Sequence, residues 1–67
     1  MTYGAIADEL AVLPAAMLEI RTLRRLSVRA AARQIGVSFS TVSRFESGHD
    51  VALSSAVSIL RWLGGAS

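Results

Sequence analysis

Residues 26–48 read LSVRAAARQIGVSFSTVSRFESG, and this stretch decides the fold. It contains two short amphipathic patterns with helical spacing, at residues 28–35 and 39–46, joined by a Gly-Val-Ser turn. A serine precedes each pattern, and the hydroxyls of Ser27 and Ser38 can accept hydrogen bonds from the first turn of a helix. The stretch therefore predicts two helices joined by a tight turn.

Three residues shape the expected turn. Two helices that cross at a steep angle need a small side chain where they touch, and Ala32 supplies it four residues before Gly36. Gly36 can adopt the left-handed conformation that ends many helices, and Val37 fills the angle between the helices. The second helix exposes Phe39, Ser40, Ser43 and Arg44 in place of the usual Lys and Glu. This layout predicts a helix-turn-helix whose second helix enters the DNA major groove.

The rest of the chain predicts three more helices, at about residues 2–12, 14–25 and 52–63. Thr2 is a suitable N-cap for the first of them, and Pro14 suits the first position of the second. Gly64 and Gly65 end the last one. We therefore predict one all-α domain over residues 1–67, a compact five-helix bundle with an extra N-terminal helix and a helix-turn-helix at about 28–46.

Apolar spacing predicts which side chains form the core. On the N-terminal helix, one face carries Tyr3, Ile6, Ala7, Leu10 and Leu13. The core face expected for helix 14–25 carries Ala16, Met17, Ile20 and Leu23, and that for helix 28–35 carries Val28, Ala31, Ala32 and Ile35. For helix 39–46 the expected core residues are Val42 and Phe45. For helix 52–63 they are Leu53, Ala56, Val57, Leu60 and Leu63.

Size and composition narrow the function. A chain of 67 residues leaves little room for an enzyme cleft, and its serines lack the base and orienting acid of a nucleophilic site. The chain has no cysteine, and His49 is its only histidine, so we expect neither a metal nor a cofactor, and no small-molecule ligand. No apolar run approaches the ~20 residues of a membrane span, and no signal-peptide pattern opens the chain. We expect a cytoplasmic or nucleoid protein, not an enzyme.

Positive charge is concentrated around the helix-turn-helix. Residues 21–44 contain six arginines and no acid, whereas residues 1–20 contain three acids and no base. This coincidence favours contact with the phosphates of DNA, the alternative being a solvated basic face.

From Leu13 to Leu63 the chain resembles the phage repressor/Cro-type helix-turn-helix domains. The matching residues are Arg21, Leu26-Ser27, Ala31-Ala32, Ile35-Gly36-Val37-Ser38, Thr41-Val42-Ser43-Arg44, Glu46-Ser47-Gly48 and Leu60 to Gly64. The resemblance implies a lambda-repressor-like fold and a recognition helix ending at Glu46. It also implies base contacts from Phe39, Ser40, Ser43 and Arg44, and an ion pair between Arg21 and Glu46.

Two residues depart from the family pattern. Val28 stands where the family often has a glutamine that clamps a phosphate, so the clamp falls to backbone N–H groups or to Arg29. Phe39 cannot hydrogen-bond a base, but it can pack on thymine methyl groups or else fold back into the core. The phosphate contacts that we expect come from Ser27, Arg29, Arg33, Ser38, Thr41 and His49.

The last helix carries the feature that bears on assembly. Ile59 and Trp62 are expected to lie off its core face, and the chain is 52% apolar, which is high for so small a monomer. We expect a homodimer formed through Ile6, Leu10, Ile59 and Trp62. The alternative is that the N-terminal helix covers Ile59 and Trp62 within one chain.

These observations together predict a sequence-specific double-stranded-DNA-binding transcriptional regulator of bacterial or phage origin, repressor/Cro-like, that binds an inverted-repeat operator as a dimer. One alternative is a DNA-binding antitoxin whose N-terminal helix binds a toxin. Another is a protein-interaction module on a helix-turn-helix scaffold.

Overall fold

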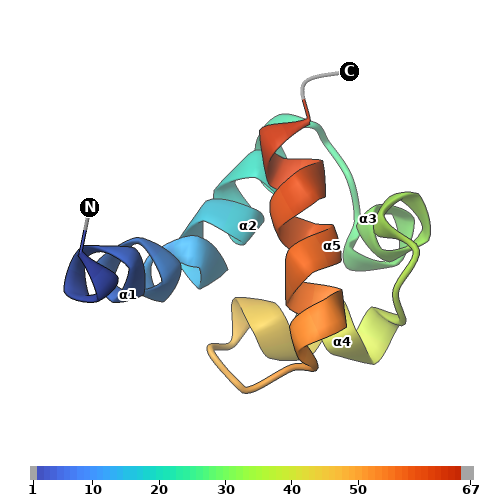
Figure 1. Cartoon of the computed structure of the whole chain (residues 1–67). Helices are drawn as coiled ribbons and strands as arrows, with labels where there is room; N and C mark the ends of the chain where they lie inside the picture. Colours follow the sequence, from blue (N-terminus) through green and yellow to red (C-terminus); the bar gives the residue numbers. More distant parts are fainter. Residues whose placement is uncertain (1, 66–67) are drawn as a thin grey trace.

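The computed structural model describes residues 2–65, which form five helices and no strand (Figure 1). The helices are α1 (Tyr3–Ala11), α2 (Leu13–Leu23), α3 (Val28–Ile35), α4 (Phe39–Glu46) and α5 (Leu53–Gly64). The predicted all-α fold is confirmed, and α3 and α4 have the predicted bounds. Helix α2 begins one residue earlier than predicted, so Pro14 occupies its second position.

Side-chain caps fix where three of the helices begin. The hydroxyl oxygens of Thr2, Ser27 and Ser38 accept hydrogen bonds from the backbone N–H three residues later, at 3.1, 3.0 and 3.1 Å. Gly36 ends α3 with a φ of 89°, and its N–H donates to the carbonyl oxygen of Ala32 at 2.9 Å. These local hydrogen bonds explain why the sequence predicts the bounds of α3 and α4 so closely.

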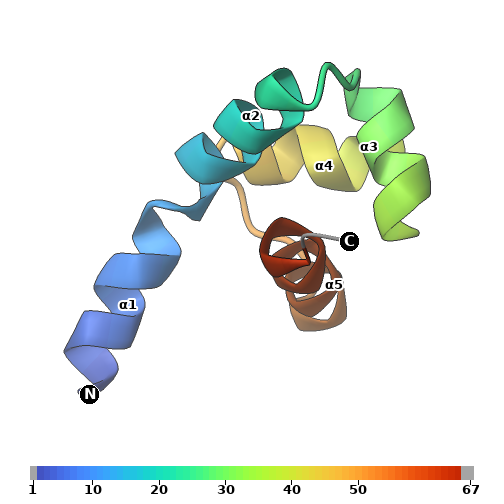
Figure 2. The same ribbon diagram turned by 90° about the horizontal axis from the view of Figure 1, so that it is seen from above.

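Helices α2 to α5 enclose a small apolar core (Figure 2). Helix α3 packs against α4, and α2 and α5 close the core from either side. The buried residues are Met17, Ala31, Ala32, Val42, Phe45 and Ile59. Ala32 is only 3% exposed, in agreement with the prediction that a small residue lies where α3 meets α4.

The predicted inward face of α5 is only partly right: Leu63 packs against the core and Ala56 is half-buried, but the other three members are exposed. Ile59, expected on the outer side, is fully buried beside Met17 and Phe45 in the core cluster, whereas Leu53 is 80% exposed. Val57 and Leu60 are also exposed. At the end of α2, Leu23, predicted to point inward, is 71% exposed.

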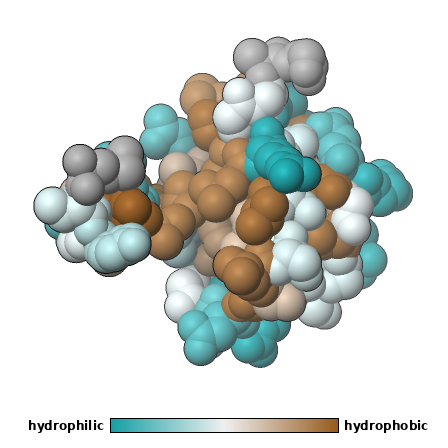
Figure 3. Space-filling view, in the orientation of Figure 1, coloured by the Kyte–Doolittle hydropathy of each residue, from teal (hydrophilic) through white to brown (hydrophobic). Residues whose placement is uncertain are grey.

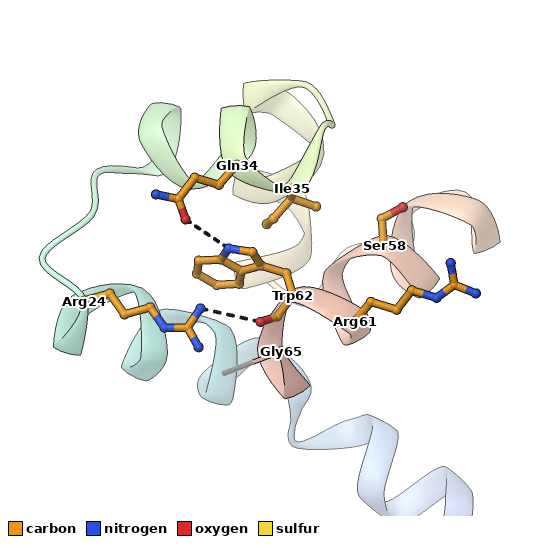
Figure 4. Close-up of a pocket in the computed structure, with 7 residues that line it drawn as sticks. All are labelled: Arg24, Gln34, Ile35, Ser58, Arg61, Trp62 and Gly65. Atoms are coloured by element: carbon orange, nitrogen blue, oxygen red, sulfur yellow. Dashed lines mark hydrogen bonds between the residues drawn. The ribbon is translucent and has the colours of Figure 1, made fainter. Parts of the chain in front are cut away.

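Trp62 packs against the core of its own chain (Figure 4). It is half-buried against the core, and its Nε1 donates to Oε1 of Gln34 on α3 at 3.1 Å. Arg24 is the C-cap residue of α2, and its guanidinium carbon lies 4.5 Å from the centre of the Trp62 ring. Trp62 therefore links the end of α5 to α2 and α3, which corrects the expectation that Ile59 and Trp62 form a dimer interface.

Helix α1 projects from this body (Figures 1 and 2). It buries none of its residues and packs mainly against α2. On its surface, Tyr3 is 91% exposed and Leu10 is 49% exposed. The alternative in which the first helix covers Ile59 and Trp62 is therefore not observed, because α1 packs mainly against α2, Ile59 is buried in the core and Trp62 packs against Gln34 and Arg24. Among residues 2–65, no helix is long and apolar enough to cross a membrane.

Candidate nucleic-acid interface

Helix α4 presents one polar face beside an aromatic ring. Its core side is formed by Val42 and Phe45, both buried as predicted. The four residues predicted to contact bases lie outside the core: Phe39, Ser40 and Arg44 are exposed and Ser43 is half-buried. Phe39 is 43% exposed and is not a member of the core cluster. The structure thus keeps this ring at the surface, at the N-terminal end of α4.

A cation–π contact joins α3 to the start of α4. The guanidinium carbon of Arg29 lies 4.6 Å from the centre of the Phe39 ring. Such a contact at an exposed site contributes about 0.5–1 kcal/mol, so it biases both side chains toward one arrangement. The sequence alone does not predict this contact, because the two residues are ten positions apart and belong to different helices. Arg29 therefore lies beside the residue that begins the candidate recognition helix.

The N-termini of α3 and α4 provide backbone donors. The first N–H groups of a helix have no partner within it, and each serine cap occupies one of them. Ser38 Oγ also lies 2.8 Å from Thr41 Oγ1, which leaves both hydroxyls engaged with each other. Ser27 and Ser38 are exposed and Thr41 is half-buried, while Arg33 is exposed on α3. The remaining free N–H groups, with Arg29 beside the start of α4, form a surface suited to anions.

The C-terminal end of α4 is held to the following loop. Nη2 of Arg44 donates to the carbonyl oxygen of Asp50 at 3.0 Å, so this side chain lies along the loop rather than over the first turn of α4. His49 is exposed in the same loop, and its N–H donates to the carbonyl oxygen of Arg44 at 2.9 Å. Arg44 and His49 thus lie apart from the Arg29–Phe39 pair.

The predicted pair of Arg21 and Glu46 is present and fixes the orientation of α4. Nε of Arg21 donates to Oε2 of Glu46 at 2.8 Å, and Nη2 donates to Oε1 at 3.0 Å. A third donor, Nη1, reaches the carbonyl oxygen of Leu26 at 3.0 Å. The hydrogen bond to Glu46 and its charge raise the pKa of Arg21 against the opposing effect of burial. One guanidinium thus ties α2, the loop before α3 and the end of α4 together.

Within residues 2–65, no cluster of three potential metal ligands occurs, and no buried side-chain N or O atom lacks a hydrogen-bond partner.

A family profile identifies the class of domain to which the chain belongs. A search among curated proteins and a search among solved structures gave no match. A family profile described as helix-turn-helix matches residues 17–64, more than two thirds of the chain. The match begins within α2 and ends at the last residue of α5, so it covers the core and leaves out α1. The chain belongs to the helix-turn-helix family of the Cro/C1 type, a family of DNA-binding regulatory domains.

Proposed function

We propose that this protein is a sequence-specific regulator of transcription, repressor/Cro-like, that reads the major groove of double-stranded DNA with α4. It acts in the bacterial cytoplasm or nucleoid, and it binds an inverted-repeat operator as a homodimer. The observation that carries the proposal is the exposed face of α4 next to Arg29 of α3. Phe39 and Ser40 supply contacts for base edges, and Arg29 supplies positive charge at the same edge of the molecule.

The rigidity of this face supports the proposal. Base readout requires side chains held in fixed register on the duplex. The Arg21–Glu46 pair, the Ser38 cap and the buried Val42 each restrict how α4 can move. The surface therefore has both the charge and the fixed geometry that major-groove recognition needs.

Selection from a random duplex library tests the proposal directly. We expect enrichment of one short motif. The binding affinity should fall steeply as the salt concentration rises, because association releases counterions from the DNA and this release is less favourable at high salt. Equal binding to all duplexes, or binding that does not depend on salt, would refute sequence-specific recognition.

The arginines of α3 are expected to contact phosphates. Arg29→Ala and Arg33→Ala should each reduce the slope of log affinity against log salt by roughly one unit. Arg61→Ala is the matched control, because it removes the same charge from an exposed site on α5. The measurement uses a duplex with a single half-site, so that pairing of chains does not contribute. An equal change of slope for Arg61→Ala would mean that only overall charge matters.

Arg44 is expected to read a base after releasing its hydrogen bond to the Asp50 carbonyl. Its donors can reach O6 and N7 of guanine, so Arg44→Ala should cost about 1–3 kcal/mol and relax the preference at one base pair. Library selection with the variant measures this. A variant that binds more weakly but keeps every base preference would assign Arg44 to a phosphate or to the loop.

A further inference from the structure

We propose that α1 of one chain packs against α5 of a second copy, so that two chains exchange their first helices. This inference rests on the proposed function, since it specifies the interface of the proposed homodimer. It assigns the interface to exposed residues instead of Ile59 and Trp62. The α1 seam consists of Tyr3, Ile6 and Leu10. The α5 seam consists of Leu53, Val57 and Leu60.

Both seams have the spacing of helices that pack along their length. In the α1 seam, steps of three and then four residues separate Tyr3, Ile6 and Leu10. The α5 seam has steps of four and then three. Alternating steps of three and four are the pattern by which two helices interdigitate in coiled coils. Every member of both seams is at least 36% exposed, so neither seam is fully covered within its own chain.

The exposed surface of the chain is larger than its size explains. The surface-to-mass relation for folded monomers gives about 4,100 Å² for a chain of 7.1 kDa, whereas this chain exposes 4749 Å². Helix α1 contributes to the difference, because it projects and buries no residue (Figure 2). Isolated helices shorter than about 12–15 residues are marginal in water, and α1 has nine. A partner that covers α1 would stabilise it.

A hollow lies between the end of α1 and α5. It measures about 250 Å³, and the side chains that line it include Leu10, Leu13, Phe45, Val51 and Leu60. Sites for drug-sized ligands are larger, about 300–1,000 Å³, so this hollow suits inserted side chains better than a ligand. Figure 3 shows apolar surface gathered over the middle of this face, between the projecting N-terminal region and the body. Leu10 of the α1 seam and Leu60 of the α5 seam both line the hollow.

A second copy fits this patch because each chain carries both seams. A two-fold axis makes the contact of α1 with the partner's α5 occur twice, which covers all four seams at once. Charge favours the same pairing. The charged residues of α1 are Asp8 and Glu9, and the only charged residue of α5 is Arg61. Glu9 and Arg61 fall at positions flanking their seams, where coiled coils place ion pairs between helices.

The interface is tested with two variants of the full chain in sedimentation equilibrium. Ile6→Glu places a negative charge in the α1 seam, and Val57→Lys places a positive charge in the α5 seam. Each variant alone should associate at least about tenfold more weakly than the wild type, because the charge loses its water in the interface. Leu23→Glu is the matched control, since Leu23 is 71% exposed on α2 and should leave association unchanged.

Mixing the two variants distinguishes the exchanged arrangement from other dimers. In a mixed pair, the introduced carboxylate meets the introduced ammonium at one contact and the other contact is wild-type. The 1:1 mixture should therefore associate more tightly than either variant alone. If α1 paired with α1, Val57→Lys would associate like the wild type, and if α5 paired with α5, Ile6→Glu would do so. Either result overturns the proposal, as does a wild-type chain that stays monomeric up to millimolar concentration.

DNA binding is measured separately, so the two proposals can fail independently. The variants should keep the base preference of the wild type on a single half-site. A wild-type chain that does not self-associate but prefers one half-site sequence would refute the exchange of helices and leave the proposed function intact. A wild-type chain that self-associates but shows no preference among DNA sequences would refute the proposed function and leave the α1–α5 contact intact.

Discussion

Single residues decide the turn of this domain, and Gly36 is the clearest example. Its φ of 89° lies in the left-handed region, yet a Cβ added there would meet no atom within 4 Å. The requirement for glycine at this position is therefore conformational rather than steric.

Gly36→Ala should lower the free energy of unfolding by about 1–2 kcal/mol, the cost of holding an alanine in a left-handed conformation. Gly64→Ala is the matched control. Gly64 lies at the end of α5 with open space around it and without a positive φ, so alanine there should not lower the free energy of unfolding. Urea denaturation of dilute protein measures both. Equal effects of the two substitutions would contradict the conformational argument.

The Phe39 ring is expected to contact a thymine methyl group, with Arg29 keeping the ring in place. Replacing that thymine by uracil removes only the methyl group and should cost about 0.8 kcal/mol of binding, the value of one buried methylene. Phe39→Ala should abolish the preference for thymine over uracil, and Arg29→Ala should reduce it. Titration of half-site duplexes measures this, and a Phe39→Ala variant that still prefers thymine would rule the contact out.

Contacts between elements orient α4, and Arg21 and Glu46 make the strongest of them. Their side chains are 16% and 12% exposed, so the pair is mostly removed from water. Breaking one partner then leaves a charge without compensation, which is costlier than the pair itself is stabilising.

Glu46→Gln should lower the free energy of unfolding by about 2–3 kcal/mol, because Arg21 loses a charged partner. Glu19→Gln, on the exposed surface of α2, should change it by less than about 0.5 kcal/mol. The double variant Arg21→Met, Glu46→Leu should recover much of the loss. Thermal melts monitored by circular dichroism give these values, and a Glu46→Gln protein as stable as the wild type would exclude a structural role for the pair.

Trp62 holds the end of α5 against α2 and α3. Trp62→Ala should lower the free energy of unfolding of the dilute monomer by about 2–4 kcal/mol, somewhat below the cost in a fully buried core because the ring is only half-buried. Leu60→Ala, on the exposed seam of α5, should lower it much less. If Trp62→Ala weakened self-association but left the free energy of unfolding unchanged, Trp62 would contact a second chain rather than α2 and α3 of its own.

At the scale of the whole molecule, the proposed dimer places two copies of α4 on one duplex. The operator should be an inverted repeat with half-site centres about 10 base pairs apart, or a multiple of that spacing. Inserting about five base pairs, half a helical turn, between the half-sites turns one of them to the opposite side of the duplex and should abolish cooperative binding. Footprinting across the spacer series tests this. The Val57→Lys variant should bind with the same affinity at every spacing.

The sequence by itself determined the local features. The start of α3 and α4 follows from serine caps at Ser27 and Ser38, and the end of α3 from Gly36, because these hydrogen bonds and backbone angles involve residues within four positions of one another. The buried positions of α3 and α4 were also readable, since each helix alternates between apolar and polar faces. The Arg21–Glu46 pair was expected only through the family resemblance.

Tertiary structure decided the orientation of α5 and the exposure of α1. Helix α5 carries large apolar residues around most of its circumference, so spacing alone fits more than one inward face. Packing against Met17 and Phe45 selected the face with Ile59, and the hydrogen bond to Gln34 fixed Trp62. The stacking of Arg29 on Phe39 likewise depends on the angle between two helices. Such choices follow from shape complementarity among distant side chains, which the order of residues along one helix does not encode.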